Sequence, residues 1–488
     1  MSAEILLLTT LLLPLVGAIG IILARNTPNV REGVTLLTSS LIAVLVIMIA
    51  VRFMNGEVFA LTLFEPLPGI AIAFKLEALG VLFALVAGLL WVVTSIYAIG
   101  YMRGHNEKNQ TRFFAAFAVS IAATMGIAFS ANLFTLFLFY ELLTLATYPL
   151  VTHAGTAEAK KGGRVYLGIL LGTSIGFFLL GILVTWVLTG SVDFQEGGIL
   201  AGHIDPAWAG LLYALFLFGI GKAAVMPFHR WLPAAMVAPT PVSALLHAVA
   251  VVKAGVFTLL KVTIYIFGGE FILSNDVTGG LIWIVAATIL IASMVAMTKD
   301  NLKARLAYST VSQLSYITLG AMLASKAGLM GASMHIAMHA FAKITLFFAA
   351  GAIFVASHKK LVSELNGLGR AMPITFVAFF IGTLSIIGLP PFGGMWSKWY
   401  LGLGAAETGQ LLLLAVLMIS SLLNIIYLLP IPIRAFFSKP EGGKHYTEIA
   451  EAPKPMLLAM IITSSACVVL FFYPDPFYRL ASLAAGGS

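Results

Sequence analysis

The sequence predicts an all-α polytopic membrane protein with about fourteen transmembrane helices in a single membrane domain, residues 1–488. Of its residues 60% are hydrophobic and only 10% are charged, and the mean hydropathy is +1.01. A soluble protein of this length would expose far more charge. A hydrocarbon core of about 30 Å is crossed by about 20 apolar residues in a helix, and windows of that kind recur along almost the whole chain.

These windows give fourteen approximate spans, of which the seventh and twelfth contain both Pro and Gly and are expected to be broken helices. The spans are 4–24, 31–51, 74–99, 113–130, 133–151, 165–188, 207–228, 242–266, 280–298, 305–325, 329–356, 373–397, 410–430 and 455–473.

The loops between these spans alternate in charge. One alternate set of loops holds 19 of the 28 basic residues: Arg25, Arg31, Arg103, Lys108, Arg112, Lys160, Lys161, Arg164, Arg230, Lys299, Lys303, Arg305, Lys359, Lys360, Arg370, Arg434, Lys439, Lys444 and Lys454. The opposite set holds five: Arg52, Lys75, Lys261, Lys326 and Arg479. The positive-inside rule places the richer set in the cytoplasm and both termini outside. Membrane topology thus explains the placement of the basic residues, and no nucleic-acid partner is expected.

The four remaining lysines, and one glutamate, lie within apolar spans: Lys222, Lys253, Lys343, Lys398 and Glu141. A lysine near a span end can snorkel to the interface, which we expect of Lys75 and Lys261. A charge at mid-bilayer costs at least about 2.5–3.5 kcal/mol and usually marks an ion pathway. We therefore predict that the five intramembrane groups move protons.

Two stretches place a lysine beside helix-breaking residues, five spans apart. The first is LFGIGK, ending at Lys222 and followed by Pro227; the second is GLPPFGGMWSK, with Pro390 and Pro391, ending at Lys398. An odd offset reverses the direction of the second unit, as in an inverted repeat. Interrupted helices at corresponding places point to the ion site of a transporter.

Glu141 stands in an otherwise apolar span, and Lys222 is its natural ionic partner. If such a pair opens and closes, the affinity of the lysine for a proton changes, and the pair acts as a charge-operated gate. A static structural ion pair is the alternative.

The eleventh span carries His335, His339 and Lys343 at intervals of four, so the three share one helical face over about 12 Å. His changes charge near neutrality and suits a proton relay. The H-x-x-x-H spacing also fits a metal, but no acid accompanies it and a lysine shares its face, so no metal site is predicted. His247, six residues before Lys253, is either a further relay group or a hydrogen-bonded core histidine. His105, His153, His203, His358 and His445 lie in loops and are expected to be solvated.

The sequence lacks the motifs that are typical of several classes of enzyme and pump. There is no nucleotide-binding loop, catalytic triad or carboxylate pair typical of a hydrolase, and the single cysteine, Cys467, excludes a cysteine-based metal or iron–sulfur site. We expect no cofactor, and an ATP-driven pump or another enzyme is not indicated.

At these residues the sequence resembles the antiporter-like subunits of respiratory complex I, membrane-bound hydrogenases and Mrp sodium/proton antiporters. The resemblance is carried by MPFHRWLPAAMVAPTPVSALLHAVAVVKAG at 226–255, HAFAKITLFF at 339–348 and GLPPFGG at 388–394. It implies fourteen helices with two inverted five-helix repeats, helices 4–8 and 9–13. The corresponding divisions are 1–112, 113–266, 280–430 and 455–488.

The resemblance also implies roles for individual residues. It matches the family's glutamate on helix 5 to Glu141, the lysines on helices 7 and 8 to Lys222 and Lys253, the helix 11 groups to His335, His339 and Lys343, and the helix 12 lysine to Lys398. The sequence most resembles the D-type Mrp subunit. M-type complex I subunits usually carry glutamate in place of Lys398, and L-type or Mrp A-type subunits carry long C-terminal extensions, whereas this chain ends at Ser488.

The implied reaction is antiport of Na+ against H+ in the cytoplasmic membrane, with Mrp subunits of the A, B, C, E, F and G types as partners. Apart from Glu141 no acidic cage for Na+ is evident, so the sodium path is expected in a partner. Two alternatives stay open: a proton-pumping subunit of a redox complex, and a scaffold that conducts nothing. Five intramembrane ionisable residues argue against the scaffold.

The loop asymmetry predicts that both termini are extracytoplasmic. A reporter that fluoresces only in the cytoplasm, fused after Ser488, should stay dark even when the full-length fusion protein is present in the membrane. A bright full-length fusion would overturn the orientation or the span count.

Overall fold

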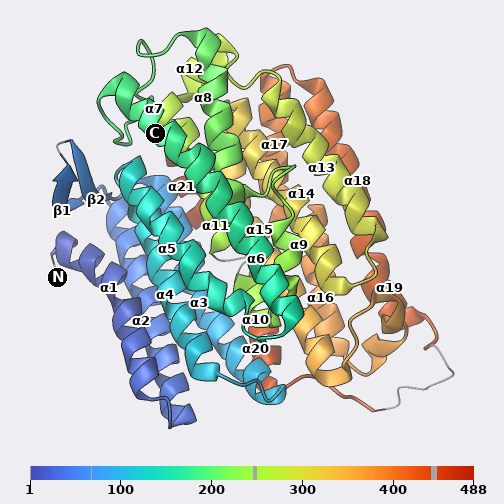
Figure 1. Ribbon diagram of the computed structural model, residues 1–488. Helices are drawn as coiled ribbons and strands as arrows, with labels where there is room; N and C mark the ends of the chain where they lie inside the picture. The colour runs from blue at the N-terminus through green and yellow to red at the C-terminus, as the bar shows by residue number, and fades with distance from the viewer. Residues whose placement is uncertain (1, 68, 246–249, 441–447, 488) are drawn as a thin grey trace.

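The computed structural model describes residues 2–67, 69–245, 250–440 and 448–487, and shows a bundle of mostly long, roughly parallel helices with one small β-hairpin at its edge (Figure 1). The N-terminal part of the chain comprises α1 (Ala3–Leu23), α2 (Pro28–Met54), β1 (Ala60–Leu67), β2 (Ile70–Lys75), α3 (Ala78–Gly104), α4 (Gln110–Phe129), α5 (Leu133–Val151), α6 (Ala157–Thr173) and α7 (Leu179–Thr189).

The middle and C-terminal parts comprise α8 (Pro206–Gly219), α9 (Trp231–Ala234), α10 (Thr240–Ala244), α11 (Val251–Lys261), α12 (Gly269–Asn275), α13 (Leu281–Thr298), α14 (Leu302–Leu323), α15 (Lys326–Ser357), α16 (Pro373–Ile387), α17 (Gly394–Glu407), α18 (Leu411–Leu428), α19 (Pro430–Phe437), α20 (Lys454–Phe472) and α21 (Asp475–Ala484). Short π-helical turns follow α6 and α11, at Ser174–Phe178 and Val262–Phe267.

The all-α membrane fold is confirmed, but the number of fourteen spans is not. Among the described residues, ten helices are long and apolar enough to cross a membrane, or eleven if the bent pair Val251–Phe267 and Gly269–Asn275 is one span. Two of the missing spans are interrupted segments, because α8 and α16 are short apolar helices of 14 and 15 residues. The third is α14, a continuous helix of 22 residues that is not among these apolar candidates. An apolar window does not reveal how many residues in it are helical.

Both predicted helix breaks are present. Helix α8 ends at Gly219 and is followed by a 3-10 turn, Gly221–Ala223, that contains Lys222. Helix α16 ends at Ile387, and α17 begins only at Gly394, after the segment with Pro390 and Pro391. Proline lacks the N–H that a helix interior needs, so it leaves backbone carbonyls without their helical partners.

Helix starts elsewhere are set by side-chain caps. Asn132, Ser325 and Asn301 accept backbone N–H groups at the first turns of α5, α15 and α14, respectively. Such caps supply acceptors for N–H groups that the helix itself cannot satisfy.

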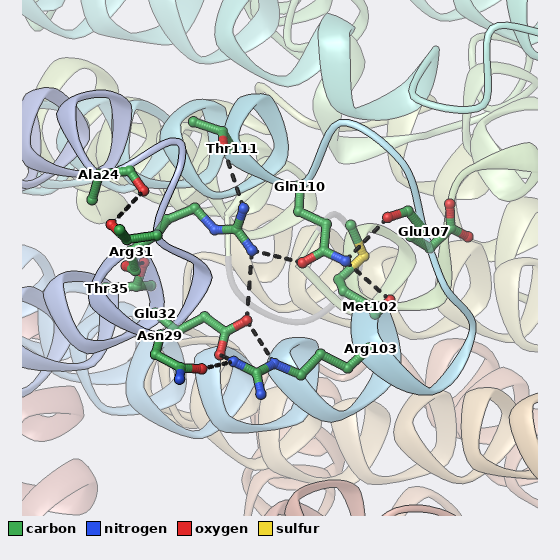
Figure 2. A network of polar contacts seen from close by, with 11 residues as sticks. Ala24, Asn29, Arg31, Glu32, Thr35, Met102, Arg103, Glu107, Gln110 and Thr111 are labelled. Carbon is green, nitrogen blue, oxygen red and sulfur yellow. Dashed lines mark hydrogen bonds and ion pairs between the residues drawn. The ribbon is translucent and has the colours of Figure 1, made fainter.

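A polar network joins α2, α3 and α4 at one end of the bundle (Figure 2). Arg103 donates to Glu32 Oε1 at 3.0 Å, and Arg31 donates to Gln110 Oε1 at 2.7 Å. Gln110 in turn donates to the carbonyl of Glu107 at 3.0 Å. Arg31 and Glu32 are both 5% exposed, so these protein partners, and not water, stabilise their charges.

The other end of the bundle, which we call the hairpin end, is closed by elements that the apolar windows did not predict. Strands β1 and β2 pair antiparallel, and β2 is fastened to the turn before α5: Ala131 N donates to Ala73 O at 2.9 Å, and Asn132 Nδ2 donates to Ala71 O at 2.8 Å. The short helix α21 contacts α3 and α15 at this end. Its buried residues are Phe477, Leu480, Ala481 and Ala484, at the spacing of one helical face.

Helix α15 is the centre of the bundle. It contacts α3, α10, α11, α14, α16, α17, α20 and α21, and every residue from Ala327 to Ile353 is buried. The predicted histidine and lysine stripe therefore lies at the middle of the protein, away from lipid.

Gly255 allows α11 to pack directly against the backbone of Lys222. A Cβ atom on Gly255 of α11 would lie 2.3 Å from the backbone carbon of Lys222 and 2.3 Å from the N of Ala223. No side chain separates α11 from the 3-10 turn.

We expect Gly255→Ala to destabilise the protein by about 1–3 kcal/mol, the usual cost of overpacking a close contact. The free energy of unfolding, measured for the purified chain in detergent micelles, checks this. Gly168→Ala on α6 is the control, because a Cβ there meets nothing within 4 Å. Equal stability of the two variants would contradict the close contact.

Candidate functional site

The predicted ionisable residues are withdrawn from the surface of the bundle. Lys222, Lys253 and Lys343 are 0% exposed, and His335 and His339 are 2% and 1% exposed. Lys398 is partly buried. Each of these groups therefore needs polar partners within the protein.

Lys222 finds its partners on α5. Its Nζ donates to the carbonyl of Tyr140 at 2.8 Å and to Thr144 Oγ1 at 2.5 Å, and lies 3.2 Å from the centre of the Tyr140 ring. The turn at the break is held in place from α9, since Trp231 Nε1 donates at 2.9 Å to the carbonyl of Gly221, which also accepts the backbone N–H of Ala224 at 3.0 Å.

Glu141 does not pair with Lys222 in this structure: the structure gives no ion pair between them within 4.0 Å, although Glu141 is adjacent to Tyr140 in the chain. Both carboxylate oxygens are buried, and neither has a hydrogen-bond partner among the described residues. A buried carboxylate without a partner is costly, so the position of Glu141 favours a rearrangement that supplies one.

Lys253 and His339 join α11 to α15 directly, with 2.6 Å between Lys253 Nζ and His339 Nδ1. A hydrogen bond needs one donor and one acceptor, so the two groups cannot both be fully protonated while this bond exists. The pair therefore shares a proton between α11 and α15.

His335 continues the line along α15. Its ring centre is 5.6 Å from that of His339, and it stacks on Tyr316 at 5.8 Å. Its Nδ1 is 2.7 Å from Ser397 Oγ, and its Nε2 is 3.1 Å from Gln313 Oε1. Both ring nitrogens thus have partners, as a relay requires.

Lys398 lies at the second break. Its Nζ donates to the carbonyl of Ile387 at 3.1 Å and to Ser421 Oγ at 3.0 Å, and lies 4.9 Å from the centre of the Tyr316 ring. Ile387 is the last residue of α16, so its carbonyl is freed by the break. Tyr316 thus contacts both His335 and Lys398.

Lys343 is the one member of the predicted stripe that turns to a separate partner. Its Nζ donates to Ser309 Oγ at 2.7 Å, and Ser309 also accepts a hydrogen bond from Tyr427 at 3.0 Å. The structure therefore places Lys343 beside the His335–His339 line, with its own hydroxyl partners.

The partners themselves were missed by the sequence reasoning, which looked for charges. Helix α14 supplies Ser309, Gln313 and Tyr316, and its buried residues include Ser309, Thr310, Ser312, Gln313 and Ser315. Such a run of hydroxyl and amide side chains inside a buried helix was the available signal.

Several other residues differ from what the sequence led us to expect. Lys261 does not snorkel, because its side chain is 0% exposed and ion-paired to Glu77 at 3.0 Å. His153, expected to be solvated, is 4% exposed; its burial lowers its pKa, although nearby Glu107 acts in the opposite direction. His247 lies outside the described residues. Within the described part of the chain no group of three or more His, Cys, Asp or Glu could hold a metal.

A cavity of about 490 Å³ lies at the end of the bundle opposite the hairpin. It is lined by polar side chains, including His105, Glu107 and Lys303, and by Ala350 on α15. Ala350 is seven residues, or about 10 Å along the helix, from Lys343. The wall of this cavity formed by α15 therefore lies about two helical turns from Lys343.

Comparison with known proteins identifies the family. A family model described as NADH:quinone oxidoreductase/Mrp antiporter, TM, matches residues 130–424. The chain belongs to this family.

Relatives in the NADH:quinone oxidoreductase/Mrp antiporter family include both kinds of complex. The chain is 33% identical over 398 residues to NADH-quinone oxidoreductase subunit N of Desulforudis audaxviator, with 78% of each chain covered. It is 32% identical over 441 residues to the A-type Na(+)/H(+) antiporter protein of Alkalihalophilus pseudofirmus, covering 84% of this chain and 53% of that one. The chain thus spans about half the length of that antiporter protein.

Solved structures show the same fold. A chain of the Mrp complex from Dietzia sp. has a TM-score of 0.86 at 23% identity, covering 100% of this chain and 97% of that one. A chain of an archaeal membrane-bound sulfane sulfur reductase gives the same TM-score and identity, covering 98% and 97%. This family member is therefore an antiporter-like membrane subunit by fold.

The contacts of Lys222 give a direct prediction. Thr144→Val removes one of its two hydrogen-bond acceptors, and should cost about 1.5–3 kcal/mol of stability if the amine is charged. The free energy of unfolding in micelles checks it. Thr124→Val is the control, since that hydroxyl donates to the carbonyl of Ser120 in its own helix. A Thr144→Val loss no larger than that of the control would show that Lys222 does not depend on the hydroxyl.

Proposed function

We propose that this chain is the proton-translocating subunit of a multisubunit Na+/H+ antiporter, of the D type in an Mrp assembly. The observation that carries the proposal is the hydrogen bond of 2.6 Å between Lys253 and His339. It joins α11, which contacts the turn that carries Lys222, to α15, which contacts the helix that carries Lys398. A bond that requires one donor and one acceptor passes a proton between the two helices when its members exchange those roles.

From His339 the proton path continues to His335 and then, past Tyr316 and Ser421, to Lys398. The contacts along it are the ring contacts and hydrogen bonds described above. Buried polar chains of this kind are rare in membrane segments and mark proton relays in pumps and transporters. Lys343 lies beside this line on the same helix, with Ser309 as its hydrogen-bond partner.

Glu141 is the proposed gate. Its carboxylate has no hydrogen-bond partner among the described residues, while the nearby Lys222 is satisfied by a carbonyl and a hydroxyl of α5. Closing a Glu141–Lys222 ion pair would draw the ammonium from these neutral acceptors. The proton affinity of Lys222 would then depend on whether the pair is closed.

The charge asymmetry of the loops supports a cytoplasmic membrane location with the hairpin end outside. Among the ionisable residues of the proposed gate and proton path, Glu141 is the one acid. This supports a sodium route through a partner subunit. The A-, B-, C-, E-, F- and G-type Mrp subunits are the proposed partners.

A proton-pumping subunit of a redox complex is the second candidate. The relative that favours it is the quinone oxidoreductase subunit, which matches over 78% of both chains. The same residues would then carry protons, with energy from electron transfer in place of a sodium gradient.

Antiport in everted vesicles containing the complete complex tests the proposal. Sodium added outside should dissipate a preformed proton gradient, and Lys398→Arg should abolish this nearly as fully as Lys398→Ala. Arginine keeps the charge but stays protonated in proteins, so it cannot release the proton that lysine can. Assembly of each variant is checked on a native gel.

Three outcomes would count against the proposal. No sodium response in the wild-type complex, together with proton pumping driven by a quinone or by NADH, would favour the redox candidate. Near-normal antiport in Lys398→Arg would remove Lys398 from the path. Wild-type antiport in an assembled Glu141→Ala complex would remove the gate.

A further inference from the structure

A second buried ion pair lies outside the central line, at the hairpin end. Lys261, the last residue of α11, is 0% exposed; its Nζ is 3.0 Å from Glu77 Oε2 and donates to the carbonyl of Ser130 at 2.6 Å. The rings of Phe194 and Phe257 also face the ammonium, at 4.1 and 5.7 Å. Glu77, at the start of α3, is 7% exposed.

The ion pair with Lys261 uses only one of the two carboxylate oxygens of Glu77. Its Oε1 is buried and has no hydrogen-bond partner among the described residues. The side chain caps no backbone N–H of α3, although it occupies the position where a cap would stand. A carboxylate placed only to neutralise Lys261 would normally use its second oxygen as well.

The pair borders a cavity of about 530 Å³. Lys75, Glu77, Glu196 and Tyr265 line it with polar atoms, and the end of α21 forms another wall. Glu196 is exposed, so the cavity extends from the surface of the hairpin end inward to the residue Glu77. A cavity of this size and polarity holds water.

The same helix connects this pair to the central line. Lys253 lies eight residues before Lys261 on α11, about 12 Å at 1.5 Å per residue. Thr258 lies between them, with its hydroxyl bonded to the carbonyl of Ala254 at 2.7 Å.

We propose that the Glu77–Lys261 pair is a proton port, a site where protons pass between water at the hairpin end and Lys253. A proton leaves a hydronium in the cavity and bonds Glu77 Oε1. The carboxyl then passes a proton to Lys261 after that lysine has given one to Lys253, through water that spans a separation of about 12 Å between the two amines. One proton enters and one leaves at each step, and no electron is transferred. The port rests on the proposed proton-translocating function and adds an exchange site to the path that ends at Lys398.

A purely structural salt bridge makes different predictions. Replacing a buried ion pair by apolar residues of similar volume is often neutral or stabilising, whereas removing one partner is destabilising. The double variant Glu77→Leu/Lys261→Met therefore separates the two roles. It should restore transport if the pair only supports the fold, and should leave transport impaired if the pair carries protons.

Water access is tested first, without any transport assay. In a Cys467→Ser background, which removes the only native thiol, Glu77→Cys should react with a membrane-impermeant cationic methanethiosulfonate at least about tenfold faster than Glu32→Cys, because access controls thiol modification. Glu32 is the matched control: it is 5% exposed and paired to Arg103, and it lines none of the cavities described above. The reagent is applied to right-side-out and everted vesicles. Equal or slower labelling of Glu77→Cys would overturn the port.

Transport is then measured in the assembled complex. Glu77→Gln should lower the proton flux at least about tenfold, within the range expected for loss of a proton-transferring group, while Glu32→Gln keeps the wild-type flux in correctly assembled protein. Wild-type flux in Glu77→Gln, or restored flux in the double apolar variant, would overturn the port. If the wild-type complex moves no protons, the proposed function fails, and the port fails with it, whatever the labelling shows.

Discussion

The buried ammonium and imidazole groups of this protein depend on one constraint: within the bundle each must find an oxygen or nitrogen partner in the protein itself. In a hydrocarbon environment an unsatisfied polar group costs several kcal/mol. The two helix breaks answer this constraint for Lys222 and Lys398. At the second break the carbonyl freed at the end of α16 accepts directly from Lys398; at the first, the interrupted backbone places Lys222 against a carbonyl and a hydroxyl of α5. The positions of Gly and Pro in the sequence follow from where the charges must lie.

The same constraint explains why the centre of the protein is built around α15. Its histidines and lysine are separated from lipid by neighbouring helices. Besides Lys253 of α11 and Lys398 of α17, these neighbours contribute hydroxyl and amide groups. Ser309, Gln313 and Ser397 are neutral groups that both donate and accept. Neutral partners let the charge on the line change without a large repulsion from a fixed ion.

Much of this arrangement could be predicted from the sequence. Hydropathy and loop charge predicted the membrane fold, and lysines beside Gly and Pro predicted both breaks, because these signals depend on local composition. The partners could not be predicted in the same way. Whether Glu141 meets Lys222, or Lys253 meets His339, depends on the rotation and depth of packed helices, which spacing along one helix does not determine. The hairpin and the burial of Lys261 were missed for the same reason, since a lysine near a window's edge has the same sequence signature whether it reaches water or an acid on another helix.

The close contact at Gly255 has a mechanical consequence. With backbone pressed on backbone and no flexible side chain between them, α11 and the turn that carries Lys222 behave as one stiff body. Lys253 lies on that helix only two residues before the contact. A tilt of α11 that lengthens the bond to His339 therefore also displaces the amine of Lys222 from its acceptors on α5. The two lysines are mechanically coupled, so a movement that opens one proton contact changes the other at the same time.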